Sequence, residues 1–393
     1  MLLVTELMLR TNALIIGGGP AGATAARFLA DSGVETVLIE RDLSYVKPCG
    51  GGMPSSALDE LHIPRSVVKK EIERIRIVSP KGNEVEIELT GGHLCITERG
   101  VLDAQLRGMA QESGASIQEG EFIGFEQTGR STVSIIRKKE NNEEIKITSD
   151  YVIAADGITS RVASALNYPR PACLFTISAK LKHAPLPEST GGNGACEFWF
   201  GKEHASHFYS WIFPSREYSS IGTGSCNAKE LGSLLDRFTR RRFNTPFKDL
   251  AEGHALSGKA RAFKMPEWNG KLFNIANVLF TGDAAGMVMP VTYEGIYYAM
   301  KSGEFAARAV MEGNPEVYKK LWKNRFYKRF LLMSRIRSRL FKSDRDIEKW
   351  VSLHRNPEIQ ELAMRLWLQK KPGNSAFVPY INIFKSIFKS MGS

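Results

Sequence analysis

The sequence predicts an α/β fold with a parallel sheet, and three observations support that prediction. A short apolar run at 13–16 leads into a glycine-rich turn at 17–22, and a helical stretch and a second apolar run follow. Near the end of the body, the apolar run 277–280 leads into a second turn at 281–286. The 393 residues suffice for two or three domains, and 43% hydrophobic and 24% charged residues exclude a disordered, collagen-like or disulfide-framework protein.

The first element has the pattern of a dinucleotide-binding β-α-β unit. Gly17 permits a tight turn, Gly19 lets the backbone approach a pyrophosphate, and Gly22 allows the helix to pack closely on the strand. The N-terminus of that helix faces the phosphates. Glu40 ends the second strand, 18 residues after Gly22, and its carboxylate is placed to accept from ribose hydroxyls. This unit alone does not separate FAD from NAD.

Three later elements complete the set. Arg99 precedes a helical stretch at 101–106, Asp156-Gly157 follows the apolar strand 152–155, and the turn 281–286 is followed by a further helical run. In this order the four elements resemble the flavoproteins with two dinucleotide-binding domains that are related to p-hydroxybenzoate hydroxylase. The sequence is therefore expected to have that fold, with a β-rich substrate domain and a helical C-terminal region.

That resemblance implies FAD as the cofactor and gives several residues a role. Asp283 is expected to hold a ribityl hydroxyl, and a helix opened by residues 284–286 is expected to point at the flavin. Asp156-Gly157 is expected near FAD and an incoming nicotinamide, and Arg99 near the ribose or phosphates. The complete predicted cofactor-binding set is Gly17, Gly19, Ala21, Gly22, Glu40, Arg41, Cys49, Gly50, Gly51, Arg99, Asp156, Gly157, Gly282, Asp283, Gly295 and Ile296.

Two further segments narrow the chemistry. Cys49 precedes three consecutive glycines in a loop, where a backbone can lie close to a flat ring. The segment 209–214 is an alternating aromatic strand, which places Tyr209, Trp211 and Phe213 on one face. With the strand at 75–80, these segments resemble the geranylgeranyl reductase family, and the helical tail resembles its branch acting on (bacterio)chlorophylls.

The family resemblance implies an FAD-dependent reductase that saturates isolated C=C bonds of a prenyl chain by hydride transfer. Electrons would come from NADPH or reduced ferredoxin, the latter as an electron-donor protein. Cys49 and Tyr209 are the candidate proton donors, and the expected substrate-binding residues are Gly52, Tyr209, Trp211, Phe213 and Pro290. Two alternatives stay open: Cys49 as an inert packing residue, and the aromatic stripe as ordinary core.

A flavin-dependent monooxygenase or halogenase on the same fold is the alternative function. A halogenase is expected to carry a Trp-x-Trp-x-Ile-Pro strand, whereas this chain has Tyr209 and Phe213 at the first and fifth positions. The cysteines and histidines lack metal-ligand spacing, so no metal is expected. Cys95, Cys173, Cys196 and Cys226 are expected to be buried structural thiols, and their unpaired spacing suits a reducing, cytoplasmic compartment.

The net charge of +11 is concentrated at the end of the chain. Residues 316–393 carry 18 basic and 6 acidic side chains, and the rest is close to neutral. Residues 318–342 alternate basic with large apolar groups, as does the stretch 380–391, so both are candidates for packing on the body or for peripheral contact with an anionic membrane. A nucleic-acid-binding tail was the less favoured alternative, so no nucleic acid partner is expected.

The predicted domains follow from these elements. We expect a discontinuous FAD-binding domain, a β-rich substrate domain and a basic helical C-terminal region. Their ranges are 1–80, 98–165 and 270–312 for the first, 81–97 and 166–269 for the second, and 313–393 for the third. Within the first, alternating strands between 119 and 155 are expected to form a β-meander broken near residues 128 and 141.

Overall fold

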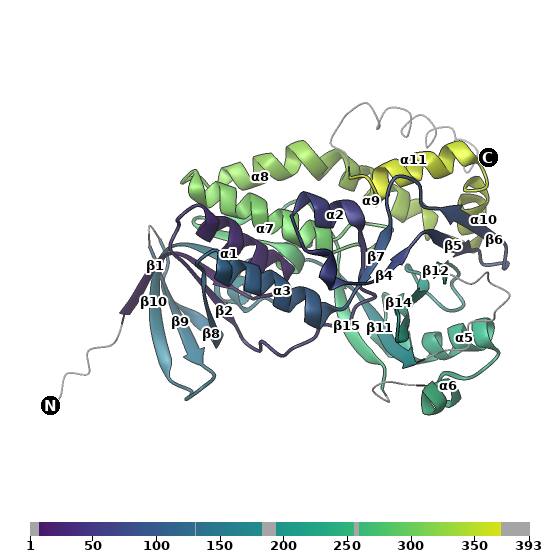
Figure 1. Cartoon of the computed structure of the whole chain (residues 1–393), viewed down its shortest axis with the longest axis horizontal. Helices are drawn as coiled ribbons and strands as arrows, with labels where there is room; N and C mark the ends of the chain where they lie inside the picture. The colour runs from purple at the N-terminus through teal and green to yellow at the C-terminus, as the bar shows by residue number, and fades with distance from the viewer. Residues whose placement is uncertain (1–7, 130, 183–193, 255–258, 371–393) are drawn as a thin grey trace. The chain divides into compact units, whose positions relative to one another are not determined.

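The computed structural model describes residues 8–129, 131–182, 194–254 and 259–370 (Figure 1). The chain divides into two compact units. Unit one comprises 1–47, 100–173 and 265–333, and unit two comprises 48–99, 174–264 and 334–393. Residues 48–80, which the sequence placed in the FAD-binding domain, thus belong to unit two. The assignment of a function to each predicted domain stays a prediction.

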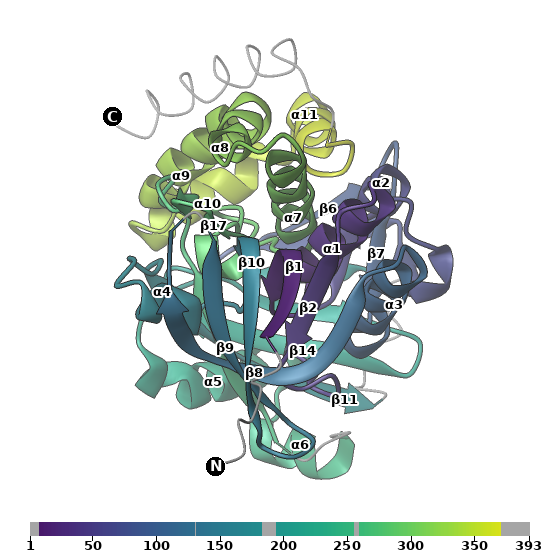
Figure 2. The ribbon, with the colours of Figure 1, turned by 90° about the vertical axis from the view of Figure 1, so that its left-hand side faces the viewer.

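Unit one is built on a sheet that has seven strands in the described part of the chain. Its central strand β1 pairs in parallel with β2 on one side and β10 on the other (Figure 2). Residues 13–16 of β1 are fully or almost fully buried, which explains why this run is continuously apolar. The strands are β1 (Met8–Ile16), β2 (Thr36–Glu40), β8 (Ser116–Gln127), β9 (Thr132–Lys138), β10 (Glu144–Ala154), β16 (Asn274–Ile275) and β17 (Val278–Phe280).

The predicted β-meander is confirmed. β9 pairs antiparallel with both β8 and β10, and the left-handed residue Asn142 (φ 59°) lies in the second turn. β8 also pairs in parallel with β2, and β10 pairs in parallel with β17. The first strand of the meander therefore pairs with β2, and its last strand pairs with β1 and β17.

Helices of unit one cover this sheet. Figure 1 shows α7 alongside α1, and at that crossing a Cβ on Gly303 would lie 2.1 Å from the Ala21 carbonyl oxygen. The helices are α1 (Pro20–Asp31), α3 (Arg99–Glu112, which starts at the boundary between the units), α4 (Arg161–Ala165), α7 (Ile296–Met311) and α8 (Glu316–Trp322). A π-helical turn η5 (Lys323–Tyr327) links α8 to α9 (Lys328–Leu340), which continues into unit two.

One predicted helix is absent at its expected place. Residues 284–286 do not open a long helix, because only the 3₁₀ turn η4 (Gly282–Ala285) forms there and Gly286 ends it in the left-handed region at φ 70°. The long helix α7 begins ten residues later, after Gly295. Left-handed glycines commonly terminate helical turns, which is the physical reason for the difference.

Unit two contains two sheets in the described residues, in the orders β15-β11-β14-β13-β12-β5-β6 and β3-β7-β4. The strands are β3 (Gly52–Pro54), β4 (Val68–Ile72), β5 (Arg74–Val78), β6 (Glu84–Glu88), β7 (Leu94–Thr97), β11 (Cys173–Lys182), β12 (Cys196–Trp199), β13 (Ser210–Pro214), β14 (Tyr218–Ser225) and β15 (Arg261–Pro266). The first residue of β11 and the last two of β15 belong to unit one. The helices are α2 (Ser55–Glu60), η1 (Arg65–Val67), η3 (Ala228–Glu230), α5 (Leu231–Phe243), α6 (Phe247–His254), α10 (Asp344–Leu353) and α11 (Pro357–Trp367).

The hydrophobic core of unit two joins the larger sheet to helices α5 and α6. Ile212 of β13 and Ile221 of β14 are fully buried and belong to the same cluster as Leu235 and Phe238 of α5 and Leu250 of α6. These isoleucines alternate with the aromatic residues of β13 and the small residues of β14. One face of the sheet therefore packs in the core, and the opposite face carries Trp211 and Phe213.

The free cysteines differ partly from expectation. Cys95 and Cys196 are buried, as predicted, and burial raises the pKa of the Cys95 thiol to about 11. Cys173 is only half-buried and Cys226 is exposed, so the prediction of burial was wrong for Cys226. Cys226 follows the last residue of β14, where the chain leaves the sheet. Among the described residues, no group of three His, Cys, Asp or Glu side chains is arranged to hold a metal ion.

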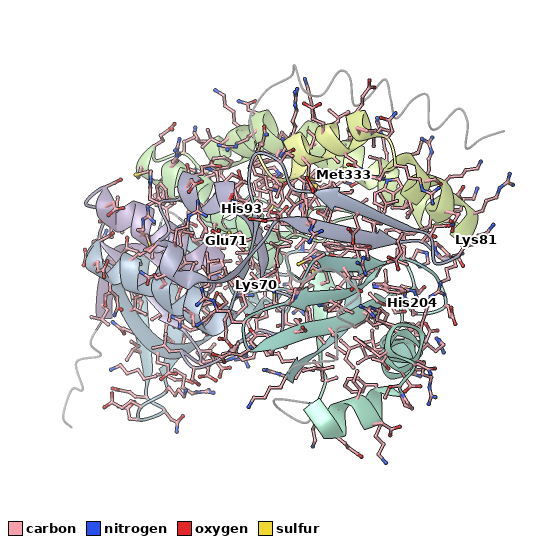
Figure 3. All side chains as sticks on the ribbon, turned by 45° about the vertical axis from the view of Figure 1, so that its right-hand side comes forward. Lys70, Glu71, Lys81, His93, His204 and Met333 are labelled. Atoms are coloured by element: carbon pink, nitrogen blue, oxygen red, sulfur yellow. The ribbon has the colours of Figure 1, made fainter. Side chains whose placement is uncertain are left out.

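A buried histidine packs between β13 and α5 of unit two. His204, labelled in Figure 3, is fully buried. Its Nδ1 lies 2.9 Å from the Ser210 hydroxyl, and its ring lies 5.6 Å from that of Phe238. The hydroxyls of Ser210 and Thr223 both donate to the His204 carbonyl oxygen. Burial, followed by the charges of Arg241 and Arg237, lowers the pKa of His204 to about 3.

We predict that this histidine makes the protein sensitive to acid. Its folded pKa lies below the ordinary value of 6.5, so between about pH 3 and pH 6.5 the unfolded chain binds more protons and stability rises with pH. The contribution is complete above pH 6.5 and falls by up to about 1.4 kcal/mol per pH unit below it. Denaturant unfolding at several pH values should show a shallower acid slope for His204→Asn than for the wild type. The exposed His62→Asn is the control, and equal slopes for His204→Asn and the wild type would contradict the prediction.

Candidate functional site: a dinucleotide cradle and a cysteine loop on an aromatic face

The glycine turn of unit one is closed by backbone contacts. Gly17 donates its N–H to the Ile39 carbonyl oxygen (2.8 Å) and adopts φ 106°, a left-handed conformation that favours glycine. A Cβ on Gly22 would lie 1.9 Å from the Gly17 carbonyl oxygen, and one on Gly17 would lie 2.3 Å from that of Ala155. Glycine is therefore required at both positions for the turn to pack between β1, α1 and β10.

The N-terminus of α1 is open where a phosphate would bind. Gly19 is the N-cap, no side chain caps the helix, and a Cβ on Gly19 would meet nothing within 4 Å. Pro20, the first residue of α1, has no N–H, but the next backbone N–H groups lack partners within the helix. Space, N–H donors and the helix dipole together suit an anionic phosphate.

Glu40 and Arg107 hold the turn from its other side. Glu40 Oε2 accepts from the Gly18 N–H at 2.6 Å, and its Oε1 accepts from the Asp42 N–H at 3.1 Å. Arg107 of α3 donates to the carbonyl oxygens of Gly18 (3.2 Å) and Leu43 (3.0 Å). Arg107 was not among the predicted residues, because its position in an amphipathic helix carries no signal. The predicted residue Arg41 is exposed beside Glu40.

Asp156 combines a structural role with an unsatisfied atom. Its Oδ2 accepts from the backbone N–H groups of Arg161 (2.7 Å) and Val162 (3.1 Å) at the start of α4. Its Oδ1 is buried without a hydrogen-bond partner. Burial raises the pKa of Asp156, and the hydrogen bond with Ser160 and those from the backbone act against that rise. An unpartnered buried oxygen is a place for a ligand hydroxyl or amide to donate a hydrogen bond.

Asp283 has a protein partner that the sequence did not indicate. It forms an ion pair with Lys47, and the two side chains are 15% and 28% exposed. The adjacent Gly282 N–H donates to the Ser302 hydroxyl of α7 at 2.8 Å, which fixes η4 on that helix. The predicted pair Gly295 and Ile296 forms the N-terminus of α7, again without a side-chain cap.

The residues of unit one fit FAD. The uncapped α1 N-terminus suits its pyrophosphate, Glu40 stands at the end of β2 where a ribose is expected, and the unpartnered Asp156 oxygen and Asp283 can accept from its hydroxyls or ring N–H groups. The individual contacts to FAD stay predictions. Pro290 also lies in unit one, whereas the predicted residues Cys49, Gly50, Gly51 and Gly52 lie in unit two, together with Arg99, the buried first residue of α3.

In unit two, the structure brings the two segments of the family resemblance together. A Cβ on Gly50 would lie 2.6 Å from Cδ2 of Phe213, so the loop backbone rests on that ring. Gly51 adopts φ 78°, its N–H donates to Cys49 Sγ at 3.3 Å, and its carbonyl oxygen accepts from the Thr97 N–H (2.9 Å) and hydroxyl (3.0 Å). Thr97, which was not among the predicted residues, therefore holds the cysteine loop on β7 while Gly50 contacts the aromatic strand.

The aromatic side chains share one face, as predicted. Ring centroids of Tyr209 and Trp211 are 6.4 Å apart, and those of Trp211 and Phe213 are 6.5 Å apart. Phe198 of β12 packs edge-on against both Tyr209 and Phe213 at 5.2 Å. The three predicted residues are at most 9% exposed, so they are also part of the packed interior. Both roles that the sequence left open are compatible with this arrangement.

A glycine pair makes room for these rings. A Cβ on Gly222 would lie 2.3 Å from Cζ2 of Trp211, and one on Gly224 would lie 2.5 Å from Cγ of Phe208. The Trp211 indole N–H donates to the Ser220 hydroxyl at 3.3 Å. The Gly-Thr-Gly sequence in β14 is a signal that could have been found, because glycine in a strand often marks a close approach.

The aromatic face continues onto the C-terminal helices of unit two. Phe200 lies 5.7 Å from Tyr209, 5.2 Å from Trp350 of α10 and 6.3 Å from Phe341, and Phe198 lies 6.3 Å from Trp367 of α11. These helices therefore complete an apolar layer around the substrate residues that the sequence predicted.

Comparison with known proteins identifies the family. Residues 10–307 match the family model described as an FAD binding domain. Over 396 residues the chain is 30% identical to geranylgeranyl diphosphate reductase of Rhodobacter capsulatus, an alignment that covers 98% of this chain and 97% of that protein. The chain belongs to the geranylgeranyl reductase family. It is an FAD-dependent oxidoreductase.

Two further proteins are similar to this member of the geranylgeranyl reductase family. It is 28% identical over 348 residues to digeranylgeranylglycerophospholipid reductase of Methanocaldococcus jannaschii, covering 84% of this chain and 85% of that protein. The crystal structure of a geranylgeranyl bacteriochlorophyll reductase-like protein from Thermoplasma acidophilum superimposes with a TM-score of 0.82 at 23% identity, covering 98% and 99% of the two chains. The predicted fold of p-hydroxybenzoate hydroxylase type is thereby confirmed.

We predict that Gly22→Ala weakens FAD binding. The added methyl group must displace the Gly17 carbonyl, and an overpacked contact of this kind costs about 1–3 kcal/mol. Roughly a tenfold or larger rise in the FAD dissociation constant is expected, measured by flavin fluorescence titration of the apoprotein. Gly108→Ala, in α3 with nothing within 4 Å of its Cβ, is the matched control. Equal FAD affinity of both variants would show that the close contact at Gly22 is dispensable.

Proposed function

We propose that this reductase saturates isolated C=C bonds in the prenyl chain of a lipid or (bacterio)chlorophyll-type substrate. The observation that carries the proposal is the contact of the Cys49 loop with Phe213 on an aromatic face inside unit two. An isoprenoid chain offers no hydrogen bonds, so its recognition depends on apolar surface and shape. The names of the relatives support the same substrate class.

When bound, FAD supplies the two electrons of the reduction as a hydride. The protein then has to add a proton to the other alkene carbon and keep water away while it does so. Cys49 is the candidate acid, because its side chain is half-buried and its sulfur accepts the Gly51 N–H, an interaction that stabilises the thiolate left after proton transfer. Tyr209, buried between Phe198 and Phe200, is the second candidate.

The alternative function is oxygen chemistry by a monooxygenase or halogenase, which share this fold. The identity of the relatives favours reduction, and the aromatic strand keeps Tyr209 and Phe213 where a halogenase is expected to differ. Purified enzyme with FAD, a reductant and a prenyl lipid decides between them. Mass spectrometry should show a gain of two hydrogens per reduced bond, whereas oxygen consumption matching reductant oxidation, with an oxygenated or halogenated product, would overturn the proposal.

The electron donor and the prenyl carrier belong to the same proposal. NADPH and reduced ferredoxin are the candidate donors, and stoichiometric alkene reduction with each donor in turn would identify the one used. Prenyl diphosphate, prenyl phospholipid and prenylated chlorophyllide, supplied separately under anaerobic conditions, would identify the carrier by the rate of product formation.

Cytoplasmic location with peripheral contact at the inner face of an anionic membrane is proposed from the basic tail. In the described part of the chain, no helix is both long and apolar enough to cross a bilayer. Tyr318, Trp322, Phe326 and Phe330 are at most 1% exposed, so the largest apolar side chains of 318–342 pack in the protein, and most of its exposed residues are basic. The amphipathic stretch 380–391 lies outside the described residues.

We predict that Cys49→Ala lowers prenyl reduction by about 10²–10⁴-fold, the usual contribution of a general acid. The substitution leaves Gly50 and Gly51 unchanged, so FAD content and folding should remain at wild-type levels. Turnover of a prenyl substrate is measured by mass spectrometry, with Cys226→Ala, an exposed thiol at the end of β14, as the control. Wild-type turnover in Cys49→Ala would exclude Cys49 as the acid and leave Tyr209 to be tested.

A further inference from the structure

A polar cluster in unit two has no part in the function proposed so far. Lys180 of β11 donates to Glu98 Oε1 at 2.7 Å, and its Nζ lies 4.3 Å from the centroid of the Tyr218 ring at the start of β14. The side chains of Lys180 and Glu98 are only 35% and 31% exposed. This cluster is thus a partly buried ion pair with a phenol beside it.

Strand register places the cluster on the face of the sheet that carries Phe213. Lys180 pairs with Ser220 of β14, and Ser220 pairs with Phe213 of β13. Residues directly opposite one another in a sheet point to the same side, and Tyr218, two residues before Ser220, points there as well. The cation, the phenol and the Phe213 ring therefore share one face.

The cysteine loop reaches this face from the smaller sheet. Gly50 rests on Phe213, and Thr97, which holds Gly51, directly precedes Glu98. In the register of β3 and β7, Gly52 pairs with Ile96, so extending this register by two residues sets Gly50 opposite Glu98. The loop thus places Gly50, the neighbour of Cys49, on the Phe213 ring, which shares its face of the sheet with the cluster.

The protonation states of the cluster suit a proton supply. Burial raises the pKa of Tyr218, Lys180 acts against this, and charge on Glu98 or on Cys49 raises it further. Burial opposes the charge of Lys180, but the hydrogen bonds and charges of Glu98 and Tyr218 together outweigh burial, so the pKa of Lys180 is raised. At neutral pH the phenol and the ammonium both keep their protons, and the phenol responds to charge on Cys49.

We propose that Tyr218 returns a proton to Cys49 after each reduction, with Lys180 and Glu98 positioning it. This inference rests on the proposed function of Cys49. The Cys49 S–H bond breaks as its proton forms the new C–H bond of the substrate; the thiolate then takes the phenolic proton of Tyr218. The phenolate, stabilised by the Lys180 ammonium, takes a proton from solvent, and no electrons move in these steps.

Tyr218→Phe tests the return of the proton. The FAD-loaded full chain is pre-reduced and given a prenyl substrate, and the first turnover is compared with the steady-state rate. The steady-state rate of Tyr218→Phe should fall at least about tenfold relative to the first turnover, while the wild type and Lys229→Met, at an exposed lysine of η3, keep an unchanged ratio. An unchanged ratio in Tyr218→Phe would overturn the inference; absence of alkene reduction by the wild type would instead overturn the proposed function.

A second measurement does not depend on turnover. Alkylation of Cys49 by iodoacetamide is followed by mass spectrometry across pH in a Cys226→Ala background, which reports the thiol pKa. Lys180→Met removes the cation of the cluster and should move the midpoint of the alkylation profile upward by about 0.5–1 pH unit, while Lys229→Met should leave it in place. Equal midpoints for Lys180→Met and Lys229→Met would show that Lys180 does not act on Cys49, and would overturn the inference even if Tyr218→Phe does not fold.

Discussion

Close approach of backbone to backbone is the constraint on which the rest of this structure depends. In unit one, α1 can follow β1 only because Gly22 lets the helix lie against the Gly17 carbonyl, and α7 can cross α1 only because Gly303 lies against the Ala21 carbonyl. These contacts leave the N-terminus of α1 pointing into open space rather than into a neighbouring side chain. The phosphate site is therefore a consequence of helix packing that any side chain at these glycines would disturb.

The same constraint recurs in unit two and has a different result. Gly51 brings the cysteine loop against Thr97, and Gly50 brings it against Phe213, while Gly222 lets the Trp211 ring lie across β14. In unit two, these glycines let the aromatic rings and the loop that carries Cys49 lie close together. A loop of this kind has little stability of its own, so its position depends on the sheet beneath it.

Buried charge strengthens that sheet. Glu197 of β12 is 3% exposed and accepts from Arg242 Nε (2.8 Å) and Nη2 (2.9 Å) and from the Trp199 indole N–H (2.7 Å). Arg242 compensates the charge of Glu197, so removing either side chain would leave the other charge uncompensated in the interior. The network ties α5 to the strand that carries Phe198, and so fixes the ring that packs on Tyr209 and Phe213.

The sequence was sufficient for features that depend on local pattern. The glycine turn, the meander of β8 to β10 and the common face of Tyr209, Trp211 and Phe213 follow from spacing, and the family follows from two short segments. Contacts between residues far apart in the chain were not predictable: Lys47 with Asp283, Arg107 with Gly18, and Thr97 with Gly51 each join segments whose separation carries no periodic signal. The exposure of Cys226 depends on where β14 ends, which propensity does not define within two residues.

The question left open by the sequence, whether the aromatic stripe is core or substrate wall, has a physical answer in the packing. Each ring contacts another at 5–7 Å and the Gly50 backbone lies on Phe213, so the rings form a stiff apolar surface with few rotamers to lose on binding. In the proposed function, such a surface would hold an isoprenoid chain by shape and would discriminate little between chains that differ by a methylene, which is worth only about 1–3 kcal/mol. Selection among prenyl substrates would then have to come from contacts with the group that carries the chain. The position of the reacting bond would depend on the loop that carries Cys49 and rests on Phe213.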